Sequence, residues 1–412
     1  MHILMDGIHI VPQMKGVGRY ALNTLRELLI LDISLKVSIL LIDERPFDTL
    51  PQTNRVKYIH VRWRNHLWHG FKTLPMWIRQ LRPDVVFIPY ETTMGRVNRP
   101  YAMVCHDIPQ KIREAQKQGN GNSGVVRNRM YHWMDDLLLG RSLRGAERVF
   151  SNSHYVAEWL KKEVRVDASR LACAPCAPGA DFFHLSQEVD VEAVRERLNS
   201  PGGYILAFHT GDFRENFAVV PKVYQKVVDD GFEQNLVVAG VRNDARALVE
   251  SSLLSFSWRD RVRIIPFLES GREKELAEIY SAASAYLDPS LQEGFGMQVI
   301  EAMACGVPVV CSNRGALPEV AKDAALLVDP EDPEEMASAV IKILKNQTFS
   351  DQMKEQGYKR AACFSWERTA EVIYGGLLDV RKSAQKNLHI PQQEENGDRV
   401  HECTPQLPSQ PL

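Results

Sequence analysis

Short apolar runs alternate with helical patterns along most of the chain. In the first half, six runs are apolar and rich in β-forming residues, as buried parallel strands are: His2–Met5, Lys36–Ile42, Lys57–Val61, Asp84–Pro89, Ala102–His106 and Arg148–Ser151. Between the first two runs, Tyr20–Leu31 places apolar residues at helical spacing. Strands interleaved with helices predict βαβ units and a parallel, doubly wound sheet.

The alternation breaks around Asp181–Ser200, where a polar helical stretch leads into a Pro-Gly-Gly turn. A second series of strands follows it: Tyr204–Phe208, Leu236–Ala239, Val262–Ile265, Ala285–Leu287, Val307–Cys311 and Ala325–Val328. Helical patterns fall between these strands, notably at Glu273–Ala283 and Pro333–Leu344. The sequence therefore predicts an α/β protein with two doubly wound, Rossmann-like domains and a cleft between them.

Domain limits follow from these breaks. A length of 412 residues suits two domains better than one core, and we place them at residues 1–185 and 200–368. Residues 386–412 are rich in Gln, Pro, Glu and Asn and poor in large apolar residues, which predicts a disordered polar tail. The stretch Gln116–Gly124 predicts a mobile loop inside the first domain.

Charge and composition narrow the function classes. The formal net charge is only −2, and no nucleic-acid-binding module is recognisable, so we expect no nucleic-acid partner. The N-terminus, MHILMDGIHI, reads as a first strand because no basic segment precedes its apolar run. No stretch approaches the roughly 20 apolar residues of a membrane span. These features predict a cytoplasmic protein.

The cysteines point away from a metal site. Seven are scattered along the chain, and Cys173 and Cys176 form a C-x-x-C pair with no second ligand pair nearby. A structural zinc site needs four ligands. We therefore expect reduced thiols and no metal.

The stretch Tyr286–Pro318 carries the most informative chemistry. A strand (Ala285–Leu287) leads through a loop containing Gly294 and Gly296 into a helix at Met297–Ala304. A helix start offers unpaired N–H groups and the positive end of the dipole to an anion. The glycines allow a ligand to approach the backbone closely.

Two carboxylates frame this helix start. Glu293 precedes the helix, and Glu301 lies one turn inside it with a side chain that leans back toward the start. Carboxylates at both ends of an anion site suit a molecule with hydroxyls at its ends and phosphates in its middle, as in a nucleotide sugar. The same two residues also fit a solvated helix start that pairs with the dipole, so the residues alone leave the choice open.

The stretch resembles the E-x7-E signature of family 4 of the retaining glycosyltransferases, which have the two-domain GT-B fold. The resemblance extends to flanking positions: Pro266, Leu276, Ile279, Tyr280, Ala283, Ala302–Gly306, Pro308, Gly315, Pro318, Glu319 and Asp329–Pro330. FSWERTAEVIY (Phe364–Tyr374) is similar to the family's last helix, which returns to the first domain. The resemblance thus spans about Tyr204–Leu378 and implies that residues 369–385 form the returning helix.

The resemblance implies a role for each part of the stretch. Glu293 would hold sugar hydroxyls, and Glu301 would hold ribose hydroxyls. The backbone of Phe295–Met297, with Gly294 and Gly296, would face the sugar and the phosphates. The family retains anomeric configuration and needs no metal or other cofactor. It moves a sugar from a UDP-, GDP- or dTDP-sugar to a glycan or lipid-linked acceptor, so positive charge and N–H groups must stabilise the departing diphosphate.

The loop after the second domain's first strand departs from the family pattern. The family places an Arg/Lys pair there to hold the diphosphate, whereas HTGDFRENF has Arg214 followed by Glu215. We assign the phosphate contact and a catalytic role to Arg214, with an exposed surface arginine as the alternative. Since an acid beside a diphosphate repels it, we expect Glu215 to point away or the loop to take another register.

Two motifs of the first domain resemble the family more weakly. GVGRY lies between the first strand and the first helix, where Gly16 and Gly18 can approach a donor, although a simple tight turn has the same letters. His106 and Asp107 end a strand at the carboxyl edge, where α/β proteins bind ligands. The resemblance places His106 near the donor sugar as a catalytic residue. A hydrogen-bonded structural histidine is the alternative.

Residues Arg55 to Arg82 form a basic, aromatic segment. It contains seven Arg or Lys residues, no Asp or Glu, and three tryptophans, Trp63, Trp68 and Trp77. Such a segment can dock on an anionic membrane, which would suit a lipid-linked acceptor at the inner face of the membrane. The alternative is that the aromatic residues pack a helix against the sheet while the charges stay in water.

Three other functions compete with the retaining transferase. A catalytically weak or non-catalytic binding subunit of the same fold is favoured by Glu215. A nucleotide-sugar 2-epimerase fits the fold but fits the E-x7-E context less well. A dehydrogenase would use Gly16–Ala21 as its dinucleotide motif, yet that loop lies several residues past the strand and only Asp43 ends the second strand.

Overall fold

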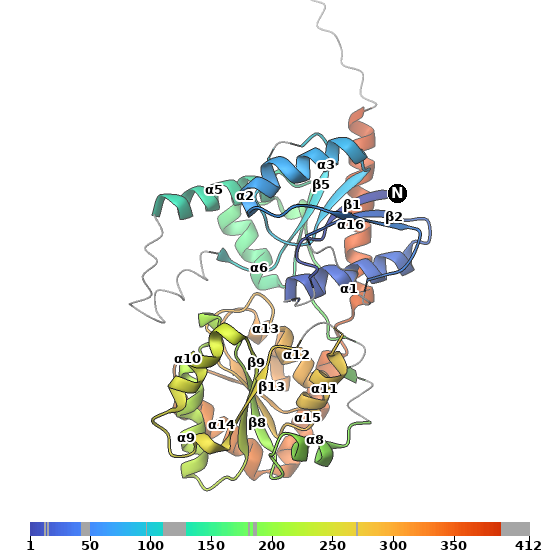
Figure 1. Ribbon diagram of the computed structural model, residues 1–412. Coiled ribbons are helices and arrows are strands. Elements are labelled where there is room, and N and C mark those ends of the chain that lie inside the picture. The colour runs from blue at the N-terminus through green and yellow to red at the C-terminus, as the bar shows by residue number, and fades with distance from the viewer. Residues whose placement is uncertain are drawn as a thin grey trace, which may run out of the picture.

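The computed structural model describes residues 1–11, 14, 16–42, 50–95, 97–109, 129–179, 182–183, 188–268 and 271–388. These residues form two α/β domains, one above the other in Figure 1. The loop predicted at Gln116–Gly124 and nearly all of the predicted tail at 386–412 lie outside the described residues.

The first domain is built on a seven-stranded sheet with the order β3-β2-β1-β4-β5-β6-β7. Its strands are β1 (His2–Asp6), β2 (Lys36–Leu41), β3 (Val56–His60), β4 (Val85–Ile88), β5 (Tyr101–Cys105), β6 (Arg148–Ser151) and β7 (Leu171–Cys173). All neighbouring strands are parallel. The chain moves outward from β1 in both directions, so the predicted doubly wound sheet is confirmed. The short edge strand β7 was not predicted.

Helices cover both faces of this sheet. They are α1 (Gly16–Leu31), α2 (His66–Trp68), α3 (Leu74–Leu81), α5 (Arg129–Gly145) and α6 (His154–Trp159), with π-helical turns at His69–Thr73 and Leu160–Val164 and a 3-10 turn at Ala168–Arg170. Helix α1 buries Ala21, Leu25 and Leu28 on the sheet, at the predicted helical spacing. It begins four residues before the predicted start, so the GVGRY motif forms its first turn.

The second domain repeats the architecture with six parallel strands in the order β10-β9-β8-β11-β12-β13. Its strands are β8 (Tyr204–Phe208), β9 (Asn235–Val241), β10 (Val262–Pro266), β11 (Ala285–Asp288), β12 (Val309–Ser312) and β13 (Ala325–Val328). Its helices are α8 (Val191–Arg197), α9 (Val220–Asp229), α10 (Asn243–Leu253), α11 (Glu273–Ser281), α12 (Met297–Ala304), α13 (Leu317–Ala321), α14 (Pro333–Lys345) and α15 (Gln347–Ala361). Short 3-10 turns lie at Phe213–Glu215, Phe217–Val219, Arg259–Arg261 and Lys322–Ala324. All six predicted strands are present within two residues.

Two helices at the domain borders decide where each domain ends. Helix α8 precedes the predicted start at residue 200, yet Arg197 pairs with Glu278 of α11, so α8 packs with the second domain. The last helix, α16 (Trp366–Leu388), leaves the second domain and lies along the first domain's strands in Figure 1. Its Ile373 and Leu377 are fully buried in the first domain's core. The chain therefore connects the domains twice.

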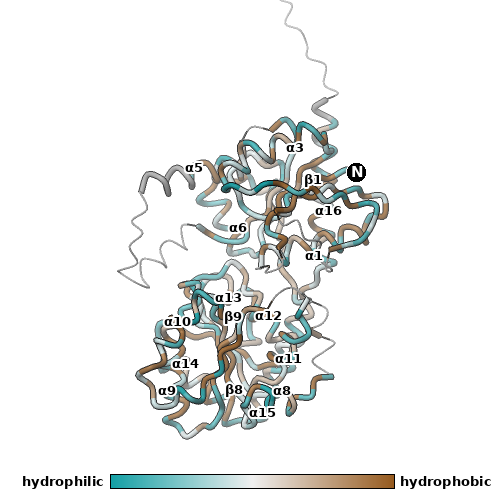
Figure 2. Tube along the Cα trace, viewed as in Figure 1, coloured by the Kyte–Doolittle hydropathy of each residue, from teal (hydrophilic) through white to brown (hydrophobic). Residues whose placement is uncertain are grey.

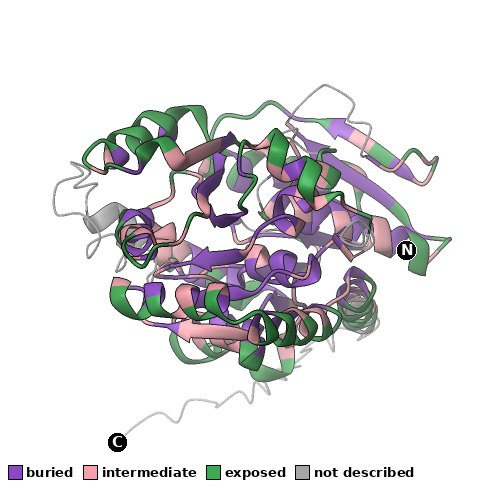
Figure 3. Ribbon diagram, turned by 90° about the horizontal axis from the view of Figure 1, so that it is seen from below, coloured by how far each residue is buried: buried purple, intermediate pink, exposed green. Residues whose placement is uncertain are grey.

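Apolar residues concentrate on the sheets. Figure 2 shows hydrophobic strands inside each domain, and Figure 3 shows the strands buried while the outer helices keep exposed faces. In the part of the chain that the structure describes, no helix has the length and apolar character needed to cross a membrane.

Candidate functional site

A cavity of about 310 Å³ lies between the two domains, where the carboxyl ends of both sheets meet. Its wall includes the start of α1, the loop after β5, the loop after β8 and the segment from β11 to α12. Ligands of open α/β sheets bind at this edge of the strands. Nine residues singled out from the sequence line the cavity: Gly16, His106, Arg214, Glu293, Gly294, Phe295, Gly296, Met297 and Glu301.

Gly18 differs from the other predicted residues. A Cβ atom at Gly18 would lie 2.2 Å from the His9 carbonyl oxygen, and Gly18 is not among the residues that line the cavity. The absence of a side chain at Gly18 allows α1 to pack closely on the chain after β1. The structure therefore does not place Gly18 against a donor.

The start of α12 is open toward the cavity. Its N-cap, Gly296, has φ 98°, and no side chain caps the first turn. A Cβ at Gly296 would lie 2.3 Å from Leu317 Cδ2, so the tight loop requires glycine. The side chain of Gln298, in the first turn, also lines the cavity. Uncapped N–H groups at a helix start form an anion site when other groups complete it.

The loop before α12 is docked on the first domain. Ser153 Oγ donates a hydrogen bond to the Gly294 carbonyl at 2.7 Å. A Cβ at Gly294 would lie 1.8 Å from the His106 carbonyl oxygen, which also accepts a hydrogen bond from Asn152 Nδ2 at 3.0 Å. The close contact between the domains thus depends on the absence of a side chain at Gly294.

Glu301 lies at one end of the cavity and contacts the other domain. Its side chain is 2% exposed, and its Oε1 lies 2.5 Å from Nη2 of Arg19 in the first turn of α1. This contact lacks hydrogen-bond alignment, so Oε1 is a buried acceptor without a hydrogen-bond partner. Tyr280 donates to the other oxygen, Oε2, at 3.2 Å. Glu301 therefore keeps the capacity to accept a hydrogen bond from a ligand.

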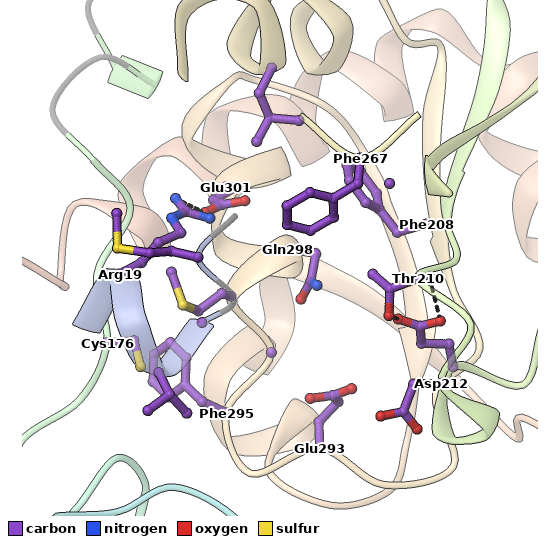
Figure 4. Close-up of a pocket in the computed structure, with 18 of the residues that line it drawn as sticks. Arg19, Cys176, Phe208, Thr210, Asp212, Phe267, Glu293, Phe295, Gln298 and Glu301 are labelled. Atoms are coloured by element: carbon purple, nitrogen blue, oxygen red, sulfur yellow. Dashed lines mark hydrogen bonds and ion pairs between the residues drawn. The ribbon is translucent and has the colours of Figure 1, made fainter. Parts of the chain in front are cut away.

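Glu293 lies at a different place along the cavity, with Gln298 between the two glutamates in Figure 4. Burial is the main reason that the pKa of the Glu293 carboxyl lies well above its ordinary value. Arg214 opposes this rise in pKa, whereas Asp288 and Asp107 add to it. The burial and the neighbouring acids thus favour the protonated form of this carboxyl, which can donate a hydrogen bond.

Arg214 faces acids from both domains. Its Nη1 donates to Asp107 Oδ2 at 3.0 Å, and its Nη2 donates to Asp212 Oδ2 at 2.8 Å. Its side chain is 20% exposed. The alternative of an exposed surface arginine is therefore wrong.

Glu215 is engaged by its own loop. The backbone N–H and the hydroxyl of Thr210 both donate to its carboxylate at 2.7 Å, and His209 Nδ1 lies 2.9 Å from Oε2. These contacts hold the Glu215 carboxylate on its own loop, and the residue still borders the cavity.

His106 combines the two alternatives raised by the sequence. It lines the cavity, yet its Nε2 donates to the Pro89 carbonyl at 2.8 Å and its ring packs edge-on against Tyr20. The bond to a carbonyl fixes the Nε2–H tautomer and leaves Nδ1 as an acceptor.

Sequence reasoning missed the far end of the cavity and Arg19. Phe208 and Phe267 line one end with apolar surface, which suits a flat heteroaromatic ring. Phe208 ends β8 and Phe267 follows β10, and a place at the carboxyl end of a strand is the one signal that could have found them. Arg19 belongs to the GVGRY motif, but its contact with Glu301 could not be read from that motif.

Metal coordination has no support in the described residues, which contain no group of three or more His, Cys, Asp or Glu side chains arranged to hold an ion. Cys173 and Cys176 are both free thiols.

Two family models match the chain, one in each domain. Residues 190–360 match the glycosyl transferases group 1, and residues 14–177 match Glycosyltransferase Family 4. These matches confirm the family that the E-x7-E stretch indicates.

Relatives and a solved structure agree with the family models. The chain is 26% identical over 230 residues to O-antigen chain mannosyltransferase B from Escherichia coli, covering 56% of this chain and 60% of that protein. It is 38% identical over 223 residues to D-inositol 3-phosphate glycosyltransferase from Corynebacterium jeikeium (strain K411), covering 50% and 52% respectively. The chain therefore spans between one half and two thirds of the length of these relatives.

Among solved structures, sucrose-phosphate synthase from Thermosynechococcus elongatus superposes with a TM-score of 0.70 at 20% identity, covering 93% of this chain and 100% of that one. The predicted two-domain GT-B fold is confirmed.

Proposed function

The chain belongs to the group 1 and family 4 glycosyltransferases, and from that premise we propose that it moves a sugar from a nucleotide-diphosphate donor to a glycan or lipid-linked acceptor. The transfer retains the anomeric configuration and needs no metal. The observation that carries the proposal is the cavity itself, in which two carboxyl side chains lie on either side of an uncapped helix start.

Each part of the donor has a matching part of the cavity. The nucleobase lies against Phe208 and Phe267. A ribose hydroxyl donates to Oε1 of Glu301, the oxygen that has no hydrogen-bond partner in the protein. The diphosphate lies over the first turn of α12, beside Arg214. The sugar lies next to Glu293, whose carboxyl group forms a hydrogen bond with a sugar hydroxyl.

Catalysis then depends on stabilising the departing diphosphate. Preorganised N–H groups at the start of α12 and the guanidinium of Arg214 meet the charge that develops as the glycosidic bond breaks. Nδ1 of His106 borders the sugar position and can accept a hydrogen bond from a sugar hydroxyl. No side chain is required to attack the sugar.

A non-catalytic binding subunit remains a second candidate, because Glu215 occupies the position where the family has a lysine. Nucleotide binding without release of free nucleoside diphosphate would favour this candidate.

Substitution of Glu293 provides a test of the enzyme. With UDP-, GDP- and dTDP-sugars in the presence of EDTA, we expect the wild-type protein to release free nucleoside diphosphate from one donor class, slowly, because water takes the sugar in place of the acceptor. Glu293→Ala should lower that rate by about 10-fold to 100-fold because hydroxyl contacts are lost. Glu293→Gln should lower it less, since an amide also donates and accepts hydrogen bonds.

The pH profile separates the role of the proton from that of the side chain's shape. Because the pKa of Glu293 is raised and its proton is lost as pH increases through that raised pKa, wild-type turnover should fall with increasing pH. The Gln variant should lack this fall. If both substitutions lower the rate equally and both variants keep the same fall with pH, the role of Glu293 is contradicted. If no donor releases nucleoside diphosphate, the proposed enzyme is contradicted.

We also propose that the basic segment Arg55–Arg82 docks on an anionic membrane from the cytoplasmic side, which brings a lipid-linked acceptor to the cavity. The side chains of Trp63, Trp68, Phe71 and Met76 are 36–46% exposed. Trp77 packs against the first domain's core instead. Packing against the sheet thus explains Trp77. It does not explain the exposed aromatic side chains that lie among cations, a combination that membrane-interface segments have.

Vesicle sedimentation tests this docking. We expect the protein to sediment with vesicles containing phosphatidylglycerol and to stay in solution with phosphatidylcholine alone. Trp63→Ala combined with Trp68→Ala should weaken sedimentation about 10-fold, because each exposed ring loses its interfacial burial. Leu248→Ala combined with Leu254→Ala, exposed apolar positions of the second domain, is the matched control. If both double variants sediment to a similar extent, the segment Arg55–Arg82 is not the docking surface.

A further inference from the structure

The cavity is acidic for a site that must receive two phosphates. Three cations are among its described lining residues: Arg19, Arg214 and Arg272. Its described lining also contains six carboxyl side chains: Asp107, Asp212, Glu215, Glu273, Glu293 and Glu301. A diphosphate in this setting needs cations that lie close to it and can turn toward it.

The loop after β8 supplies one such cation instead of two. Arg214 is already held by Asp107 and Asp212, and Glu215 follows it in place of a second cation. Arg272 does not fill the gap. Its side chain is 53% exposed and pairs with Glu275.

Arg19 is better placed to complete the site. It extends from the first turn of α1 across the domain interface to Glu301, as Figure 4 shows. Its side chain is only 22% exposed, and its close contact with Oε1 of Glu301 is not an aligned hydrogen bond. Both partners therefore retain hydrogen-bonding capacity in a partly dehydrated position, where an unmade bond to a charged group is costly.

The start of α1 also reaches the phosphate position. Gly16 lines the cavity, and a Cβ built on it would lie 3.5 Å from the Met297 sulfur, which places the first turn of α1 against the first turn of α12. The first turn of α1 contains no acidic residue. Arg19 thus lies about one helical turn from the place where the proposed function puts the diphosphate.

We propose that Arg19 is the second phosphate-binding cation of the donor site, and that donor binding exchanges its partner from Glu301 to the diphosphate. The inference rests on the proposed function. A ribose hydroxyl satisfies Glu301 Oε1 and weakens the hold of that carboxylate on Arg19. The guanidinium then turns to the phosphates and supplies the second positive charge, which the carboxylate of Glu215 cannot supply. Because Arg19 belongs to the first domain and α12 to the second, the diphosphate bridges the two domains.

The proposal is tested by measuring how much the two phosphates increase the affinity of a nucleoside for the protein. The full chain is titrated in EDTA with uridine, guanosine and thymidine and with their mono- and diphosphates, and the ratio of diphosphate to nucleoside affinity is compared between variants. This ratio cancels any change in the ribose contact with Glu301. Arg19→Ala should lower the ratio by about 10-fold to 100-fold, the worth of a charge-assisted bond to phosphate. Arg19→Lys should restore part of it.

Arg197→Ala is the matched control, because it removes an arginine of the second domain that pairs with Glu278 outside the cavity, and its ratio should equal that of the wild type. If Arg19→Ala changes the nucleoside and diphosphate affinities by the same factor, the ratio is unchanged and the proposal is overturned. Arg19 would then only compete with the ribose for Glu301. Thermal melting confirms that each variant is folded. Absence of all nucleotide binding by the wild type would instead overturn the donor site on which the proposal rests.

Discussion

Replacing Gly294 by alanine is expected to lower sugar transfer by at least about 100-fold, since small displacements of reacting groups have effects of this size. The added Cβ would lie 1.8 Å from the His106 carbonyl oxygen and 2.8 Å from Asp107 Oδ1. Relief of that clash requires the loop before α12 to leave the first domain. Glu293 would then move with the loop away from His106.

The effect of Gly294→Ala should be larger on turnover than on folding, because the clash lies between domains and each domain has a core cluster made of its own residues alone. Donor turnover and thermal melting are measured together. Gly375→Ala is the control, since a Cβ at Gly375 in α16 meets no atom within 4 Å. Wild-type turnover in Gly294→Ala would show that contact between Gly294 and His106 is not needed for transfer.

Replacing Glu301 by alanine is expected to weaken binding of the preferred nucleoside diphosphate by about 100-fold. The substitution removes the acceptor for the ribose hydroxyls and leaves Arg19 without its carboxylate partner. Glu301→Gln should weaken binding less, because an amide oxygen still accepts a hydrogen bond.

Calorimetric titration measures the effect of Glu301→Ala, and Glu278→Gln serves as the control because Glu278 contacts Arg197 outside the cavity. The loss should be larger for the nucleoside than for the diphosphate, because the substitution also releases Arg19 from its carboxylate partner and makes it available to the phosphates. If a folded Glu301→Ala protein binds the nucleotide with wild-type affinity, Glu301 does not contact the ribose.

The fold could be predicted because its signals are local. Buried parallel strands are short apolar runs, and β5, β6 and β8 appear as such runs between helical patterns. Strand β7 was missed because it has three half-buried residues at a sheet edge, too few for a pattern. The early start of α1 was missed because glycines at its first turn look like a loop.

The site could be predicted only where residues lie near one another in the chain. The segment from Glu293 to Glu301 forms a single loop and helix, so its motif carries its geometry. The contacts of Arg19 with Glu301 and of Arg214 with Asp107 join distant parts of the chain across the domain interface. Such pairs leave no periodic signal, and the acidic surroundings of Arg214 became visible only in the folded protein.

Titration of the wild-type protein with UDP, GDP and dTDP in EDTA tests the central claim most directly. We expect micromolar binding of one of these nucleotides without divalent metal, because the uncapped start of α12, Arg214 and the Glu301 oxygen that has no hydrogen-bond partner are present before any ligand arrives. Failure of a well-folded protein to bind any of the three, or binding that appears only after divalent metal is added, would contradict it.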